Sequence, residues 1–145
     1  MKNKIILSIL IAFLCAGTFG FKSGKSILPP LPDLKVTSII PSVLDGNLVL
    51  KIKIRNIGNA NATGIFDTYI ELNNTTEPSP NPKRIQNRLI AGLNAGQLKT
   101  IEVIYPASDV HPNDRRVTVV VDSKVSRITE SDETNNTRRV LIPAL

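Results

Sequence analysis

Apolar and polar residues alternate along several short stretches of this chain. Between Leu48 and Arg55, aliphatic residues fill every second position, and Lys51 and Lys53 stand between them. A period of two is typical of a β-strand with one buried face and one solvent-facing side. Further β-type segments are expected at 33–40, 65–72, 83–90, 99–105, 117–121 and 138–142. Outside the first twenty residues, no window has a sustained helical period, so the sequence predicts an all-β domain.

Turn-forming residues separate these segments. Pro41 is expected to end the first strand, and Asp45-Gly46-Asn47 to connect it to the second. Asn56, Gly58 and Gly64 tolerate positive φ, and the Asn56 side chain is expected to bond the loop backbone. Six or seven short strands separated by such turns predict an antiparallel sandwich or barrel. The residues expected to face its interior are Leu48, Leu50, Ile52, Ile54, Phe66, Thr68, Ile70, Leu72, Ile101, Val103, Tyr105, Val117, Val119, Val121, Val140 and Ile142.

The first twenty residues have a different pattern. Lys2 and Lys4 precede an apolar run from Ile5 to Ala16, and small residues follow. This order is typical of a secretory signal peptide, and the run is too short to span a membrane as a helix. We therefore expect a signal-peptide helix at 1–20, a Pro/Gly/Ser tether at 21–32 and one β-sandwich domain at 33–145. The protein is expected to be exported, with no transmembrane span in the mature chain.

The charge of the chain is mildly basic. The formal net charge is +6 at pH 7, and the basic residues are scattered along the sequence. For an exported protein this pattern argues against a nucleic-acid partner, whereas an anionic polysaccharide or lipid headgroups would be attracted to it. The alternative is that these residues cover the solvated outer faces of strands.

A polar tract between the last two predicted strands is the main candidate site. Calcium binds six to eight oxygen ligands, and acid and amide side chains crowd into this segment. Its spacing differs from that of an EF-hand loop, and the same side chains could instead fix the backbone and pair with Arg127, Arg138 or Arg139. The candidate calcium ligands are Asp122, Glu130, Asp132, Glu133, Asn135 and Asn136. No other cofactor is expected.

Catalytic motifs are missing from the sequence. Its one histidine, His111, precedes a proline in a polar loop, and no G-x-S-x-G pattern is present. The sequence also has no phosphate-binding glycine loop and no zinc-type cluster of His and Cys. We therefore predict that the protein is not an enzyme.

Four blocks of residues, which occur in the same order as in that family, resemble the CARDB domain, the cell adhesion related domain of bacteria and archaea. They are 32–36 (PDLKV), 55–62 (RNIGNANA), 93–97 (LNAGQ) and the closing stretch from 121 to 136. The resemblance covers about 32–142. It implies an immunoglobulin-like sandwich of about seven strands and a module of exported or surface proteins.

These observations together predict a secreted or surface-associated, non-catalytic binding or adhesion module. Its partner would be an envelope protein or a polysaccharide, and its oligomeric state stays open. The long proline-containing loop at 73–82 is the candidate contact surface, represented by Asn73, Asn74, Glu77, Pro80 and Asn81. The alternatives are a structural subunit that assembles through its sheet edges and a calcium-dependent accessory domain.

Overall fold

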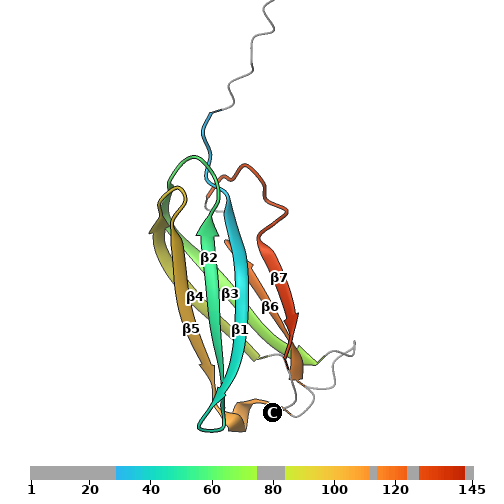
Figure 1. Ribbon diagram of the computed structural model, residues 1–145. Coiled ribbons are helices and arrows are strands. Elements are labelled where there is room, and N and C mark those ends of the chain that lie inside the picture. The colour runs from blue at the N-terminus through green and yellow to red at the C-terminus, as the bar shows by residue number, and fades with distance from the viewer. Residues whose placement is uncertain (1–28, 75–83, 112–113, 124–127, 143–145) are drawn as a thin grey trace, which may run out of the picture.

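Two antiparallel sheets face each other in the computed structural model, which describes residues 29–74, 84–111, 114–123 and 128–142 (Figure 1). The first sheet has the order β1-β2-β5, and the second has the order β4-β3-β6-β7. The strands are β1 (Leu34–Leu44), β2 (Asn47–Asn56), β3 (Ala62–Asn74), β4 (Arg84–Leu93), β5 (Leu98–Tyr105), β6 (Asp114–Val121) and β7 (Thr137–Leu141), and a 3-10 turn, η1 (Ala107–Asp109), precedes β6. The predicted all-β, immunoglobulin-like sandwich is confirmed.

Alternate side chains from both sheets fill the space between them. Most of the predicted inward positions are buried, and Phe66 is the largest side chain that is fully enclosed. Ile101 and Val140 are only partly buried but pack against this core. Val49 is an exception: it belongs to the opposite face of β2 and is nevertheless buried, beside its cross-strand neighbours Ser42 and Ile104. The core is thus almost wholly aliphatic.

Several strand ends differ from the prediction. β1 does not stop at Pro41, which pairs with Leu50, but continues to Leu44. Because β1 is an edge strand, a residue without an N–H group can be accommodated there. β3 extends to Asn74 and β4 to Leu93, so the expected loop and turn beside them are shorter than the sequence suggested.

The hairpin between β1 and β2 confirms the expected turn. Asp45 and Gly46 have φ values of 49° and 77°, and Leu44 pairs with Asn47 across them. Two consecutive residues with positive φ match the twist of the flanking strands, which explains the Asp-Gly pair.

The predicted signal peptide lies outside the described residues. So does the predicted tether as far as residue 28, but Leu31 and Pro32 belong to the folded domain. The Leu31 carbonyl accepts hydrogen bonds from the Asn59 and Ala60 N–H groups, and the Pro32 carbonyl accepts one from Ser131. In the described part of the chain, no helix is long and apolar enough to cross a membrane.

Asn56 ties the start of β1 to the end of β4. Its Oδ1 accepts hydrogen bonds from the N–H groups of Asp33 (3.1 Å) and Gly58 (3.0 Å). Its Nδ2 donates to the carbonyls of Ala60 (2.8 Å) and Leu93 (2.9 Å). The side chain is fully buried and uses its whole hydrogen-bonding capacity, so the predicted bond to the loop backbone is confirmed and extended.

Gly58 is required for a steric reason rather than for a positive φ. A Cβ at this position would lie 2.5 Å from the Leu31 carbonyl oxygen and 2.6 Å from the Asp33 nitrogen. Only glycine lets the segment before β1 pass this close to the loop. Gly64, in contrast, adopts the expected positive φ, at 100°.

We predict that Asn56→Ala destabilises the domain by about 3 kcal/mol or more, because it leaves buried backbone groups without partners. Urea unfolding followed by circular dichroism measures this difference. Asn94→Ala, at an exposed turn, is the matched control and should change the unfolding free energy by less than about 0.5 kcal/mol. Equal effects of the two substitutions would contradict the role assigned to Asn56.

Candidate functional site

The polar tract between β6 and β7 lies beside the N-terminal end of β1 (Figure 1). Its backbone is joined to β6 and to the segment that precedes β1. The Val121 N–H donates to the Asn136 carbonyl at 3.1 Å, and Ser131 donates to Pro32 at 2.9 Å. The tract therefore brings the last strand of one sheet against the first strand of the other.

Glu130 is one of two buried acidic side chains in this tract: its exposed fraction is 6%, and that of Asp122 is 4%. Its Oε2 accepts a hydrogen bond from the Leu34 N–H, and its Oε1 accepts one from Asn136 Nδ2 at 3.0 Å. Burial raises the pKa of the Glu130 carboxyl to about 7, and the hydrogen bonds from Leu34 and Asn136 only partly offset this effect. The carboxyl group thus fixes the first residue of β1.

A second set of contacts joins the tract to Asp33. Asn135 Nδ2 donates to Asp33 Oδ1 at 2.9 Å and to Asp132 Oδ2 at 3.1 Å, and Ser131 Oγ donates to Asp33 Oδ2. Asp132 Oδ1 accepts from both the N–H and the hydroxyl of Thr134, which lowers the pKa of Asp132. This arrangement is an Asx-type turn bound to the segment before β1.

Asp122 and Glu133 also accept hydrogen bonds within the tract. Asp122 has a φ of 52°, and its Oδ2 accepts from the Ile128 N–H at 3.1 Å. Glu133 Oε1 accepts from the Glu130 N–H, also at 3.1 Å. All six predicted calcium ligands therefore help to shape this connection.

The four acidic residues of this set do not form a cluster of three or more carboxylates. Within the described ranges, no group of three or more His, Cys, Asp and Glu side chains could hold a metal ion. Arg127 lies outside those ranges, and Arg138 and Arg139 are exposed with no ion pair to a described carboxylate. Calcium binding stays a prediction. The Asn135 and Asn136 Oδ1 atoms are buried without a hydrogen-bond partner in the described structure.

The predicted contact loop is only partly described. Asn73 is buried near the end of β3, with an exposed fraction of 1%. It pairs with Arg116 of β6, and its Nδ2 donates a hydrogen bond to Glu71. Asn74 is the last residue of β3, and Glu77, Pro80 and Asn81 lie outside the described residues. Burial excludes the Asn73 side chain from the contact surface.

His111 is an exposed residue of the connection between η1 and β6. Its N–H donates to Asp114 Oδ2 at 3.0 Å. This contact orders the turn before β6 and agrees with the structural role that its position suggested.

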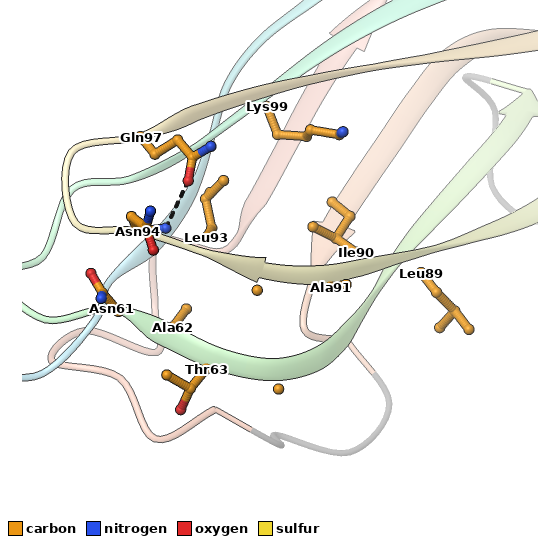
Figure 2. A pocket seen from close by; sticks show the side chains of 12 residues that line it. Asn61, Ala62, Thr63, Leu89, Ile90, Ala91, Leu93, Asn94, Gln97 and Lys99 are labelled. Carbon is orange, nitrogen blue, oxygen red and sulfur yellow. Dashed lines mark hydrogen bonds between the residues drawn. The ribbon is translucent and has the colours of Figure 1, made fainter.

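A groove of about 520 Å³ lies at the other side of the domain, where β3, β4 and β5 come together (Figure 2). The pairing of β3 with β4 shifts between Ala62 and Ile65, and Gly92 has a φ of 71° beside this irregularity. Such a bulge bends the edge of a sheet and opens space next to it. The polar side chains around the groove are Asn61, Thr63, Asn94, Gln97 and Lys99, and Leu89 is the large exposed apolar one.

Two amide side chains of this groove are fixed by their oxygen atoms. Asn61 Oδ1 accepts from the Ala95 N–H, and Gln97 Oε1 accepts from the Asn94 N–H, each at 2.9 Å. The second of these bonds is drawn in Figure 2. Sequence reasoning missed this site, since its residues come from three strands and a turn. The Gly64 and Gly92 positions were the available signal.

We predict that Glu130 makes stability depend on pH near neutrality. The folded pKa of about 7 is above the ordinary value of 4.5, so the stabilising contribution is complete below about pH 4.5 and is lost as pH rises through about 7. Glu130→Gln should remove this decline, because a side-chain amide does not ionise. The contact with Asn136 can be kept, since the Gln amide can donate to Asn136 Oδ1 once the Asn136 amide turns over. Chemical denaturation at pH 5 and pH 8 measures the difference.

Glu102→Gln is the control for this experiment. Glu102 is exposed and pairs with Lys51 at 3.9 Å on the outer face of the first sheet. Its substitution should leave the difference between pH 5 and pH 8 as in the unmodified chain. A Glu130→Gln variant with that same difference would show that Glu130 does not titrate in this window.

The calcium hypothesis predicts that Ca²⁺ raises the melting temperature above that in chelator and that Asp132→Ala removes the rise. Asp132→Ala also loses the bonds to Thr134, so the measured quantity is the calcium-dependent shift within each variant. Asp109→Ala, in η1, is the control and should keep the shift. An unmodified chain that melts identically with Ca²⁺ and with chelator rejects the site.

Comparisons with known proteins agree with this fold. The family model described as CARDB matches residues 31–140. The CARDB domain of the PF1109 protein from Pyrococcus furiosus, solved in complex with di-metal ions, has a TM-score of 0.55 and 18% identity, and the match covers 77% of this chain and 93% of that one. The search of curated proteins gives no match.

Other solved structures match this chain with lower TM-scores. β-Glucosidase 3B from Thermotoga neapolitana has a TM-score of 0.46 at 16% identity, over 77% of this chain and 17% of the glucosidase. β-Glucosidase from Kluyveromyces marxianus has a TM-score of 0.45 at 13% identity, over 79% and 15% of the two chains. The CARDB family consists of non-catalytic, adhesion-related modules that are typically extracellular or surface-associated. Since the family model matches most of the sequence, this chain belongs to the CARDB family.

Proposed function

We propose that this CARDB domain is a non-catalytic binding module of the cell envelope and that the groove beside the β3–β4 bulge holds part of its partner. The observation that carries the proposal is the set of exposed polar side chains around that groove. Concave sites with a few fixed polar groups are the usual form of a recognition site.

The ordered side-chain amides of Asn61 and Gln97 support a role of the groove in binding. Asn61 and Gln97 are already held by their oxygen atoms, so a ligand would not have to order them. Side chains that are ordered before binding reduce the entropy lost on association. Their N–H groups are left as donors, and Lys99 adds a positive charge at the same rim. An envelope protein or a polysaccharide with surface oxygen atoms fits these donors.

We predict that Leu89→Glu weakens retention of the purified chain on envelope material by at least about fivefold, because it places a carboxylate at the groove. Leu141→Glu is the matched control: Leu89 and Leu141 are 72% and 70% exposed, and Leu141 lies on β7. Co-sedimentation with envelope fractions of the native organism measures retention.

Three outcomes of this experiment would contradict the proposal. Equal effects of Leu89→Glu and Leu141→Glu on retention would show that the groove is not the contact surface. Loss of retention on deletion of residues 75–82, with no effect at Leu89, would assign binding to the predicted loop. Retention that follows concentration-dependent self-association would favour a structural subunit that assembles through its sheet edges.

A metal-dependent form of this role is the other alternative. The CARDB domain from Pyrococcus furiosus is described in complex with di-metal ions. The calcium titration of the Asp132 variant tests whether this chain has a metal site in the polar tract, whereas binding at the groove requires no metal.

A further inference from the structure

Polar side chains occupy positions on β4 that would face the core in an inner strand. Arg88 pairs with Thr68, Gln86 with Ile70 and Arg84 with Leu72, and all three partners are fully buried. Opposite residues of an antiparallel pair share a face of the sheet, so Arg84, Gln86 and Arg88 project toward the other sheet.

β5 has the same feature at its start. Lys99 pairs with the core residue Ile54 but is itself exposed. In Figure 2 the Lys99 side chain extends between β5 and the part of β4 that carries Ile90. β4 and β5 are edge strands of different sheets, and each leaves one flank of the sandwich to be covered by side chains. Long cationic side chains can cover apolar surface with their stems while their charges stay in water.

Contacts across this flank place the cationic side chains in one line. Arg84 Nε donates to the Asp109 carbonyl and Gln86 Nε2 to the Ile104 carbonyl, each at 2.9 Å. Arg88 Nη2 donates to Gln86 Oε1 at 2.7 Å. Arg88 also lies near Tyr105. Burial raises the pKa of the Tyr105 hydroxyl, and the positive charge of Arg88 partly offsets this effect. From Arg84 to Ile90 this line is about 20 Å long, and it leads into the groove at Lys99.

No carboxylate of the described residues forms an ion pair with Arg88 or Lys99. Among the described residues, the ion pair is between Lys51 and Glu102 on the outer face of the first sheet, and neither Arg88 nor Lys99 lies within 4.0 Å of a carboxylate oxygen. The donors of the groove, Asn61 and Gln97, also lack an acidic neighbour in its lining. The flank therefore presents positive charge and N–H donors to solvent, which complements an acidic ligand.

The backbone contacts distinguish between two kinds of acidic chain. An extended peptide would add to the free edge of β4 or β5 through backbone hydrogen bonds. The Ile104 carbonyl on β5 already accepts from Gln86, and the Asn87 carbonyl on β4 accepts from Arg88 at 3.2 Å. These side chains interfere with strand addition along the flank, whereas a polysaccharide would be bound by side chains alone.

We propose that the flank between β4 and β5 binds a linear acidic polysaccharide, with Arg88 and Lys99 at its carboxylates and the amides of Asn61 and Gln97 at its neutral oxygen atoms. This inference rests on the proposed binding function and names the class of ligand. Its groove end coincides with the site proposed above, and its other end extends to Arg84. The polymer would lie along the sandwich rather than at its loops.

The test is calorimetric titration of the purified chain with polygalacturonate oligomers, with neutral dextran and poly-L-glutamate as comparisons. Polygalacturonate should bind, more weakly as salt rises, and dextran should not. The double variant Arg88→Gln, Lys99→Gln should lose about tenfold or more in affinity, since each exposed ion pair contributes up to about fivefold. The double variant Lys51→Gln, Lys53→Gln removes the same charge from β2 and should lose less than about twofold.

Each remaining outcome overturns the inference. Equal losses in both double variants would mean that net charge alone attracts the polymer. Tighter binding of poly-L-glutamate than of polygalacturonate would identify an acidic peptide as the ligand. If envelope retention depends on Leu89 but is unchanged by Arg88→Gln, Lys99→Gln and by added polygalacturonate, the acidic polysaccharide is excluded while the proposed binding function stands.

Discussion

The packing of alternate aliphatic side chains between two sheets is the constraint on which the rest of this structure depends. The buried hydrophobic residues of β2, β3 and β6 form its centre, and all of them except Phe66 are aliphatic. A core of this kind is non-directional, so it specifies which face of each strand is buried but not how the ends of the strands are joined. The ends of the domain are instead defined by directional contacts from a few buried polar groups.

Asn56 and Glu130 supply these contacts at opposite sides of the same short segment. Asn56 binds the Asp33 N–H, and Glu130 binds the N–H of the next residue, Leu34. A buried polar group costs free energy unless it is hydrogen-bonded, and the hydrogen bonds of Asn56 and Glu130 lock the start of β1 between two loops. Two of the four blocks that carry the CARDB resemblance, 55–62 and 121–136, thus have a shared structural role.

The fold was largely predictable from sequence because burial in a strand follows a period of two. The ends of the strands were less predictable. Pro41 is accommodated because β1 is an edge strand, and the position of β1 in the sheet cannot be derived from its own sequence. The candidate tract at 122–136 connects the last two strands, as expected, but its Glu130 side chain turns toward the backbone of β1, a contact between residues almost a hundred positions apart. The groove was not predictable, since no single segment contains it.

The flank between β4 and β5 illustrates why position along a strand has to be combined with position in a sheet. In sequence, Arg84, Arg88 and Lys99 resemble any basic residues of solvated outer faces. The register places them instead on the inward faces of two edge strands, where a sandwich ordinarily keeps apolar residues. Covering that flank requires only side chains with long stems. The hydrogen bonds of Gln86 to the Ile104 carbonyl on β5 and of Arg88 to the Asn87 carbonyl on β4 already hinder strand addition at the two edges. Protection alone does not account for Lys99, which lies beyond those bonds at the groove. Its charge, together with that of Arg88, is better explained by an acidic ligand than by closure of the sheet edge.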